Sequence, residues 1–325
     1  MLTDGEVNGH RALYLENDAL KITVLPDKGA DVYELVHKPS GVDFLMKTPQ
    51  GLRPPGEEPP SDFLDNYEGG WQELFPNAGD PCEHRGVSLR FHGEVALLSW
   101  SHIVERDDGE ETSVLLTVRC PKTGLLLERR MRVRGNNPVL EIEEKVTNKS
   151  DSPGEFVWGH HVVLGGDFLE DGCRVDVPAR TLITPDEVYE SATASLAPGQ
   201  TERWPLARGR DTGEWVNLSR VPGPEARSHD DAFLTDLDEG RLSVTNPRKG
   251  LRFVLEWDAS LFRYVVLWAP YGGADLPPLT GIYGVGIEPW VSRHNLEEAN
   301  RRGESVRLDP GQSLRTALRA RATNA

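Results

Sequence analysis

Short runs of β-branched and apolar residues, each bounded by turn residues, recur along the whole of this sequence. Clusters such as PDKG, GNNP and NPRKG separate the runs, and the 24 prolines and 32 glycines fit a chain with many tight turns. Many short strands without alternating helices are typical of a large antiparallel sandwich or barrel. The sequence therefore predicts an all-β protein. The clearest runs span residues 19–26, 112–120, 125–135, 139–148, 241–247, 251–257 and 262–270.

Three segments fall outside this strand pattern. A short helix is expected near residues 295–302, and the proline-rich, acidic stretch 52–66 is expected to form a surface loop, as a rim or a lid. The stretch 181–228 carries turn residues and scattered tryptophans, and loops of that length are usually functional or poorly ordered. Because neither long segment has the low complexity of a linker, residues 1–325 are expected to form a single domain.

Charge and composition narrow the range of partners. The formal net charge of −16 argues against nucleic acid, whose phosphates attract basic surfaces. The N-terminal residues lack the basic and apolar regions of a signal peptide, and no window approaches the ~18 apolar residues of a membrane helix. Cys82, Cys120 and Cys173 have no metal-type spacing and are expected to be reduced thiols. We therefore expect a cytoplasmic protein without a membrane partner.

Two adjacent histidines interrupt the apolar stretch FVWGHHVVLGG at residues 156–166. Side chains alternate between the two faces of a strand, so His160 shares a large apolar face with Trp158 and Val162. His161 shares the other face with glycines, and small residues leave room for a ligand beside a sheet. We therefore expect His161 to face a cavity and His160 to lie in the core. A bulge would exchange the two, so His160 remains a candidate for substrate binding.

The stretch GIYGVGIEPW at residues 281–290 shows the same division of faces. Glu288 shares its face with Gly284 and Gly286, whereas the other face is apolar. A third stretch, SLRFHGE at residues 88–94, would place Arg90 and His92 together on the polar face of a strand, although an amphipathic edge strand has the same pattern.

The motifs of several common site chemistries are absent. The sequence contains no HExxH, CxxC or GxSxG motif, no Walker loop, and no GxGxxG after a strand. His92, His161 and Glu288 have the composition of a zinc site, but their spacing gives it no support. What remains is proton transfer near neutral pH by a histidine and a carboxylate. We therefore expect neither a metal nor a cofactor.

Several segments resemble the aldose 1-epimerase (galactose mutarotase-like) superfamily, in the order found there. They are FHGE at 91–94, WGHHVVLGGDFLEDGCRVDVPA at 158–179, HDDAF at 229–233 and GIEPW at 286–290. Two more, GGWQELFPNAGD at 69–80 and FRYVVLWAPYGG at 262–273, resemble the poorly characterised aldose-epimerase-like members. The similarity extends from about Tyr14 to Ala320. It implies a β-supersandwich of antiparallel sheets.

The resemblance also implies roles for individual residues. His92 matches a histidine that contacts substrate near the ring oxygen, His161 the general acid, and Glu288 the general base. Asp230 matches an aspartate that binds sugar hydroxyls, with its neighbour Asp231 as the alternative.

At one position this chain departs from many relatives, which carry a sugar-binding arginine where Glu68 stands here. Arg90 is a candidate to replace that arginine. An acidic residue in its place weakens the case for a phosphorylated substrate. Aromatic rings suit the apolar faces of a sugar, which makes Trp71, Trp268 and Trp290 candidates for contact with it.

The expected function is the interconversion of the α and β anomers of a free monosaccharide. Glu288 would take a proton from the anomeric hydroxyl, and imidazolium His161 would protonate the ring oxygen from the opposite side of the C–O bond. The alternatives are a non-catalytic carbohydrate-binding protein on the same fold, or an epimerase or isomerase that acts on a phosphorylated or sulfonated sugar or at another carbon. The protein is expected to be a monomer or a homodimer.

Overall fold

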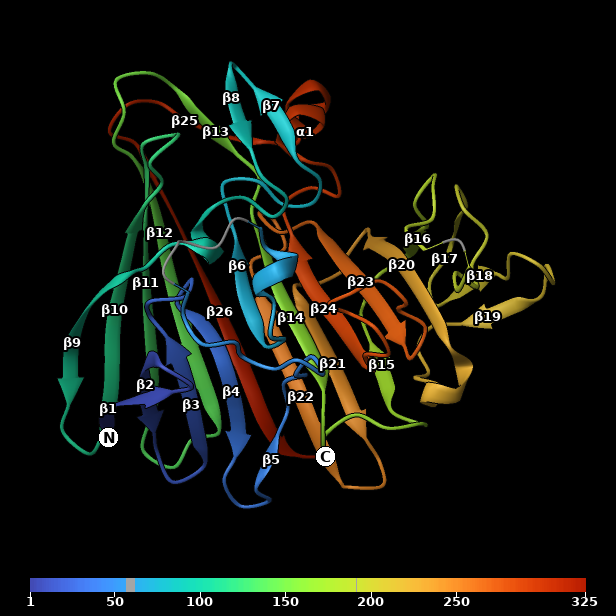
Figure 1. Ribbon diagram of the computed structural model, residues 1–325, viewed down its shortest axis with the longest axis horizontal. Helices are drawn as coiled ribbons and strands as arrows, with labels where there is room; N and C mark the ends of the chain where they lie inside the picture. The colour runs from blue at the N-terminus through green and yellow to red at the C-terminus, as the bar shows by residue number, and fades with distance from the viewer. Residues whose placement is uncertain (57–61, 191) are drawn as a thin grey trace.

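Two large antiparallel sheets face each other in the computed structural model, which describes residues 1–56, 62–190 and 192–325 (Figure 1). Within those residues the first sheet has 12 strands. Their spatial order is β1 (Leu2–Val7), β2 (His10–Glu16), β3 (Leu20–Leu25), β4 (Asp31–His37), β6 (Trp71–Leu74), β14 (Gly159–Gly165), β24 (Gly284–Trp290), β23 (Tyr264–Tyr271), β20 (Ser228–Thr235), β16 (Thr181–Ile183) and β17 (Thr201–Arg203), with β5 (Val42–Asp43) beside β4.

The second sheet has eight strands in the same described part of the chain. Their order is β15 (Arg174–Asp176), β21 (Arg241–Asn246), β22 (Leu251–Trp257), β26 (Ser313–Asn324), β12 (Val139–Asn148), β11 (Leu125–Arg134), β10 (Glu111–Arg119) and β9 (Ser101–Asp107). All seven of the clearest predicted strands are present, and the all-β antiparallel sandwich predicted from the sequence is confirmed.

The core lies between the sheets because each sheet turns its apolar side chains toward the other. In β11, burial alternates residue by residue: Leu125, Leu127, Met131 and Val133 are buried, and the residues between them are partly exposed. Arg129 also lies on the buried face and is only 1% exposed. A charged side chain at such a buried position needs polar partners. The partners of Arg129 lie next to β14, the strand that carries both candidate histidines.

Smaller elements lie at the ends of the sandwich (Figure 1). The hairpin of β7 (Cys82–His84) and β8 (Val87–Leu89), the pair β13 (Gly154–Phe156) and β25 (Val306–Leu308), and helix α1 (Leu296–Arg302) share one end. The predicted helix is confirmed: the Asn295 side chain accepts a hydrogen bond from the Glu298 amide at 3.1 Å, and Gly303 ends the helix with φ 70°.

In its described residues, 181–190 and 192–228, the long stretch forms short elements rather than one irregular loop. It contains β16, β17 and the hairpin of β18 (Leu206–Arg208) and β19 (Trp215–Asn217), and the 3-10 turn Pro224–Ala226. Cys82, Cys120 and Cys173 are free thiols. Among the described residues, no helix is long and apolar enough to cross a membrane.

Candidate functional site

Strand β14 sends its two adjacent histidines to opposite faces of the first sheet. His160 is fully buried between the two sheets, whereas His161 lines a cavity on the other face. The pairing of β14 with β6 runs without a bulge through both residues, His160 with Glu73 and His161 with Gln72. The expected alternation of the two histidines is therefore what the structure has, and His160 does not reach the cavity.

His160 belongs to a buried polar cluster that joins the sheets. Its Nε2 atom lies 3.2 Å from Oε2 of Glu144, on the second sheet, and its Nδ1 atom lies 3.4 Å from Oε2 of Glu73, on the first. The Trp71 indole donates a hydrogen bond to the same Nδ1 atom at 3.3 Å. Arg129 forms ion pairs with both carboxylates, at 2.9 Å to Glu144. These contacts give His160 a structural role between the two sheets.

The ligand atoms of Glu73, Glu144 and His160 lie within 4.8 Å of one another, which is compatible with metal coordination. However, the guanidinium of Arg129 occupies the position between the two carboxylates and neutralises one of their charges. Its Nη1 atom also donates to the backbone oxygen of Ala30 at 3.1 Å. The contacts therefore describe a buried ion-pair cluster.

A cavity of about 640 Å³ lies over β14, β24, β23 and β20, on the face turned away from the second sheet. This volume falls in the range typical of small-molecule sites. Its lining includes aromatic rings, histidines and carboxylates. The described lining residues are Phe63, Leu64, Tyr67, Gly79, Asp80, Phe91, His92, His161, Pro185, Glu187, Val188, Tyr189, Asp231, Phe233, Val266, Trp268, Leu279, Glu288, Trp290, Arg293, His294, Asn295 and Glu298.

His161 and Glu288 lie on neighbouring strands and face each other in this cavity. The Nε2 atom of His161 is 3.7 Å from Oε1 of Glu288. Burial lowers the pKa of His161 from 6.5 to about 3. Burial also raises the pKa of Glu288 well above 4.5, against the hydrogen bond that Trp290 donates to Oε2 at 3.1 Å. The buried site therefore favours a neutral imidazole beside a protonated carboxyl.

The protonation state and the geometry of the His161–Glu288 pair both differ from those expected from the sequence. The expected resting state was an imidazolium beside a carboxylate, but each charged form loses hydration in the buried site. The expected geometry placed a C–O bond between the two groups. At 3.7 Å there is no room for that, and a ligand must contact both from the open side of the cavity.

The glycines of this face make room for protein side chains. A Cβ atom at Gly286 would lie 2.4 Å from the Glu288 carboxylate, and one at Gly159 would lie 2.9 Å from the Trp290 indole. The space that the sequence suggested for a ligand is therefore occupied by the side chains that form the cavity floor.

His92 reaches the cavity from a turn. Strand β8 ends at Leu89, and both His92, with φ 60°, and Gly93, with φ 83°, are left-handed. The prediction that Arg90 and His92 share one face of a strand is therefore wrong, because the chain turns between them. The Gly79 amide donates to Nδ1 of His92 at 3.1 Å, and burial, followed by the charge of His161, lowers its pKa well below 6.5. The neutral ring thus carries its hydrogen on Nε2.

Asp231 lines the cavity and Asp230 does not. Alternation along β20 turns Asp230 away, where its carboxylate accepts hydrogen bonds from the Ser195 amide at 2.8 Å, the Ser195 hydroxyl at 2.6 Å and the Leu196 amide at 2.9 Å. Burial raises the pKa of Asp231 from 3.8 to about 6, although His229 opposes the shift. The alternative residue of the sequence analysis is therefore the one at the cavity.

Two of the three candidate tryptophans line the cavity. Trp268 stands 5.5 Å from the His161 ring and donates from Nε1 to Nε2 of His229 at 2.7 Å. Trp290 lies 5.7 Å from the His92 ring. Trp71 is on the core face with His160, where it has no access to a ligand in the cavity.

Glu68 and Arg90, two further candidates, lie outside the cavity lining. Glu68 is 1% exposed and pairs with Lys28, which also binds Asp31 at 2.8 Å. Its carboxylate therefore has a structural partner in the interior. Arg90 is exposed beside the turn, and its backbone oxygen accepts from Asn77 at 3.1 Å.

Sequence reasoning missed part of the cavity wall. Phe63 and Tyr67 place their rings edge-on to His161, at 5.6 and 5.2 Å. Phe63 lies in the stretch expected to form a rim, of which residues 57–61 lie outside the described part. Residues 185 and 187–189 also line the cavity, from the long segment 181–228. Tyr67 stands two residues before the motif GGWQELFP, and this proximity is the sequence signal that could have identified it.

Comparisons with known proteins agree with the architecture. A family model described as Domain of unknown function (DUF4432) matches residues 7–321. A candidate aldose 1-epimerase from Klebsiella pneumoniae superposes with a TM-score of 0.75 at 17% identity, over 98% of this chain and 82% of that one. The Slr1438 protein from Synechocystis sp. PCC 6803 superposes with a TM-score of 0.70 at 18% identity, over 99% of this chain and 100% of that one.

A galactose mutarotase-like protein from Clostridium acetobutylicum gives a TM-score of 0.66 at 15% identity, over 100% of this chain and 99% of that one. At these identities the solved structures establish the fold and leave the reaction to be argued from the site.

Proposed function

This chain belongs to the family described as a domain of unknown function, DUF4432, and has the fold of the galactose mutarotase-like superfamily; from this premise and its cavity, we propose that it is an aldose 1-epimerase. The proposed reaction interconverts the α and β anomers of a free monosaccharide. The observation that carries the proposal is the approach of His161 to within 3.7 Å of Glu288 on the floor of a cavity large enough for a sugar.

A hemiacetal suits such a pair because its two oxygens are bonded to the same carbon. One catalytic group gives a proton to the ring oxygen O5, and the other takes the proton of the anomeric hydroxyl O1. The C1–O5 bond breaks, and C1 and O1 form the aldehyde. After rotation about C1–C2, the same transfers in reverse close the ring on the other face. The proton count of the pair is unchanged over the cycle.

The His161–Glu288 pair needs one proton, which either His161 or Glu288 can carry. The resemblance assigns the acid to His161 and the base to Glu288, which is the charged form of the pair. The buried site favours the neutral form, with the proton on Glu288. In that form Glu288 is the donor to O5 and His161 accepts from O1, and ring closure returns the proton. The reaction requires no cofactor.

His92 and Asp231 are the proposed sugar-binding groups. The Nε2–H of His92 is a fixed donor because the Gly79 amide occupies Nδ1. Asp231 presents a carboxyl to the same cavity, and Trp268 and Trp290 offer faces or edges for the apolar side of a sugar ring.

The charges of the lining favour an uncharged sugar. Among the described lining residues, Asp80, Glu187, Asp231, Glu288 and Glu298 are acidic, whereas Arg293 is the one lysine or arginine. A phosphate or sulfonate would meet these carboxylates without a matching cluster of cations.

Anomer-resolved NMR or polarimetry over a panel of free and phosphorylated aldoses tests the proposal. The purified protein should speed the approach of one or more free aldoses to anomeric equilibrium beyond the solvent rate. Binding of a sugar without interconversion would favour a carbohydrate-binding protein on this fold and would overturn the catalytic proposal.

A further inference from the structure

The hydroxyl of Tyr67 is a buried polar group in the cavity wall without a hydrogen-bond partner among the described residues. The residue is only 2% exposed, and its hydroxyl oxygen is almost completely covered. Buried hydroxyls nearly always have a partner, so an unpaired one next to a candidate active site points to a partner supplied by a ligand.

The surroundings hold the Tyr67 ring in a defined orientation. It stacks on Phe63 at 5.5 Å, and it meets the His161 ring at 5.2 Å with an interplanar angle of 84°. The Trp268 ring lies 6.3 Å away. Backbone contacts fix the chain beside it, since the Tyr67 carbonyl accepts from Gln50 Nε2 at 3.1 Å.

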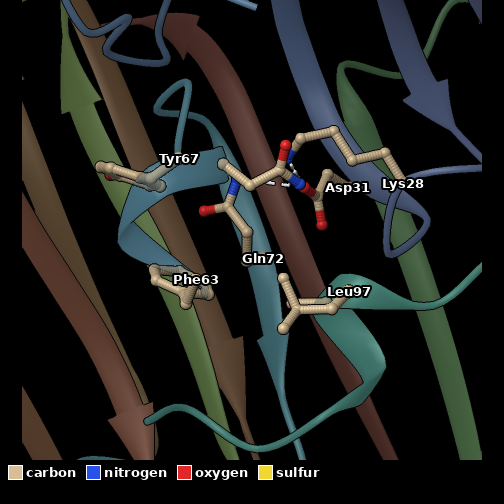
Figure 2. A pocket seen from close by; sticks show the side chains of 8 residues that line it. Lys28, Asp31, Phe63, Tyr67, Gln72 and Leu97 are labelled. Carbon is tan, nitrogen blue, oxygen red and sulfur yellow. Dashed lines mark hydrogen bonds and ion pairs between the residues drawn. The ribbon is translucent and has the colours of Figure 1, made fainter. Parts of the chain in front are cut away.

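The Tyr67 hydroxyl points away from the charged side chains of Lys28 and Asp31. Figure 2 shows Lys28 and Asp31 on one side of Gln72 and the Tyr67 ring on the other, with its oxygen at the far end. Lys28 and Asp31 are paired with each other at 2.8 Å, and the Gln72 amide nitrogen donates to the Gly69 carbonyl at 2.6 Å. These groups therefore do not bind the phenol, and of the carboxylate charges that raise its pKa, that of the cavity residue Glu288 comes first.

The phenol can act in that cavity only as a neutral donor. Burial raises its pKa well above 10, and the carboxylate charges of Glu288, Glu68 and Asp31 raise it further. It therefore keeps its hydrogen near neutral pH and does not compete with His161 as a base.

We propose that Tyr67 is a third catalytic residue, whose hydroxyl donates a hydrogen bond to the anomeric oxygen of the sugar at the His161–Glu288 pair. The inference rests on the proposed aldose 1-epimerase function. As O1 loses its proton and the ring bond breaks, negative charge develops on oxygen. A fixed donor without another partner stabilises that charge with little reorganisation.

The test compares Tyr67→Phe with wild type, using an aldose on which the wild-type protein is active. Phenylalanine keeps the ring contacts with Phe63 and His161 and removes only the hydroxyl. We expect kcat to fall roughly 100- to 1,000-fold, with a smaller change in KM. The melting temperature should be unchanged or higher, because the lost hydroxyl had no partner in the free protein.

Tyr283→Phe is a matched control. The Tyr283 hydroxyl donates to the Pro222 carbonyl at 2.7 Å, and this residue is outside the cavity lining. Its loss should lower the melting temperature and leave kcat unchanged, the opposite of the pattern expected for Tyr67.

The outcomes separate this inference from the proposed function. Wild-type activity together with a wild-type kcat in Tyr67→Phe would overturn the role of Tyr67 alone. If wild type binds a sugar but does not interconvert its anomers, the epimerase proposal fails. The catalytic role of Tyr67 then fails with it, and calorimetric titration of Tyr67→Phe shows whether its contact with the sugar remains. Absence of both binding and turnover across the panel overturns both proposals.

Discussion

His160 and His161 are neighbours in the chain, yet they lie on opposite faces of β14, one 3.2 Å from Glu144 in the core and the other 3.7 Å from Glu288 in the cavity. The core contacts of His160 hold β14 against the second sheet. Because the same backbone carries His161, the ion-pair cluster behind the strand also fixes the position of the cavity histidine. Mutations of the two residues should therefore have different consequences.

Replacement of either member of the cavity pair should abolish most of the activity. His161→Asn and Glu288→Gln keep approximate size and some hydrogen bonding but remove the ability to transfer a proton. We expect kcat for mutarotation to fall roughly 100- to 10,000-fold in each, with the folded structure retained. Circular dichroism and polarimetry on the same samples check both parts. A variant that keeps wild-type kcat would exclude its residue from proton transfer.

His160→Asn should instead reduce stability. It removes one member of a buried charged cluster and leaves the Glu73 and Glu144 carboxylates with Arg129 and the Trp158 indole as described partners, a loss typically worth about 3–5 kcal/mol. Denaturant unfolding measures the change, and kcat per folded molecule at low temperature should remain near wild type. A fully stable but inactive His160→Asn protein would contradict the structural role.

The fall of kcat at acid pH should reflect the lowered pKa of His161 rather than the ordinary pKa of a glutamate. The pKa of His161 is lowered to about 3, and that of Glu288 is raised well above 4.5, so the pair keeps its single proton between these limits. At saturating sugar, kcat corrected for the solvent rate should not fall as pH is lowered through 4.5, the ordinary pKa of a glutamate, and should fall only as pH approaches about 3. A fall of kcat with a midpoint close to 4.5 would mean that catalysis needs a carboxylate of ordinary pKa.

Asp231→Asn should stabilise the protein and weaken sugar binding. The pKa of Asp231 is raised from 3.8 to about 6, so the folded protein holds this proton more tightly than the unfolded chain. The stability contributed by the group is complete below pH 3.8, is lost as pH rises through about 6, and leaves a cost on the order of 1–3 kcal/mol above that. The gain in melting temperature of the variant over wild type should be larger at pH 8 than at pH 5.

Asp230→Asn supplies the comparison. Its carboxylate accepts hydrogen bonds from the Ser195 and Leu196 amides, so the substitution should destabilise the protein. Sugar affinity is measured by calorimetry in both variants. Wild-type affinity in Asp231→Asn, with a loss in Asp230→Asn, would reverse the assignment of the binding carboxylate.

Local geometry explains what could be predicted from the sequence. Strand alternation depends only on backbone pleating, so the runs of apolar residues placed seven strands correctly, and the faces of His160 and His161 followed from the same rule. The helix at residues 296–302 was equally local, since its cap residues Asn295 and Gly303 flank it in the sequence.

The errors arose where a residue's environment comes from distant segments. A left-handed turn at His92 and Gly93 separates Arg90 from His92, and the fit of Gly93 depends on the Phe75 backbone, which would lie 2.4 Å from an added Cβ. Glu68 resembled a cavity residue, but Lys28 binds it in the interior.

Three features follow from the order of residue types along a strand and could be read from the sequence: the all-β architecture, the separation of the two histidines, and the candidacy of Glu288. Three other features depend on the packing of distant segments: Asp231 rather than Asp230 lines the cavity, Tyr67 lies beside His161, and the buried site favours a neutral His161 and a protonated Glu288. Desolvation and side-chain contacts are sums over atoms from many segments, and those sums exist only once the two sheets have packed.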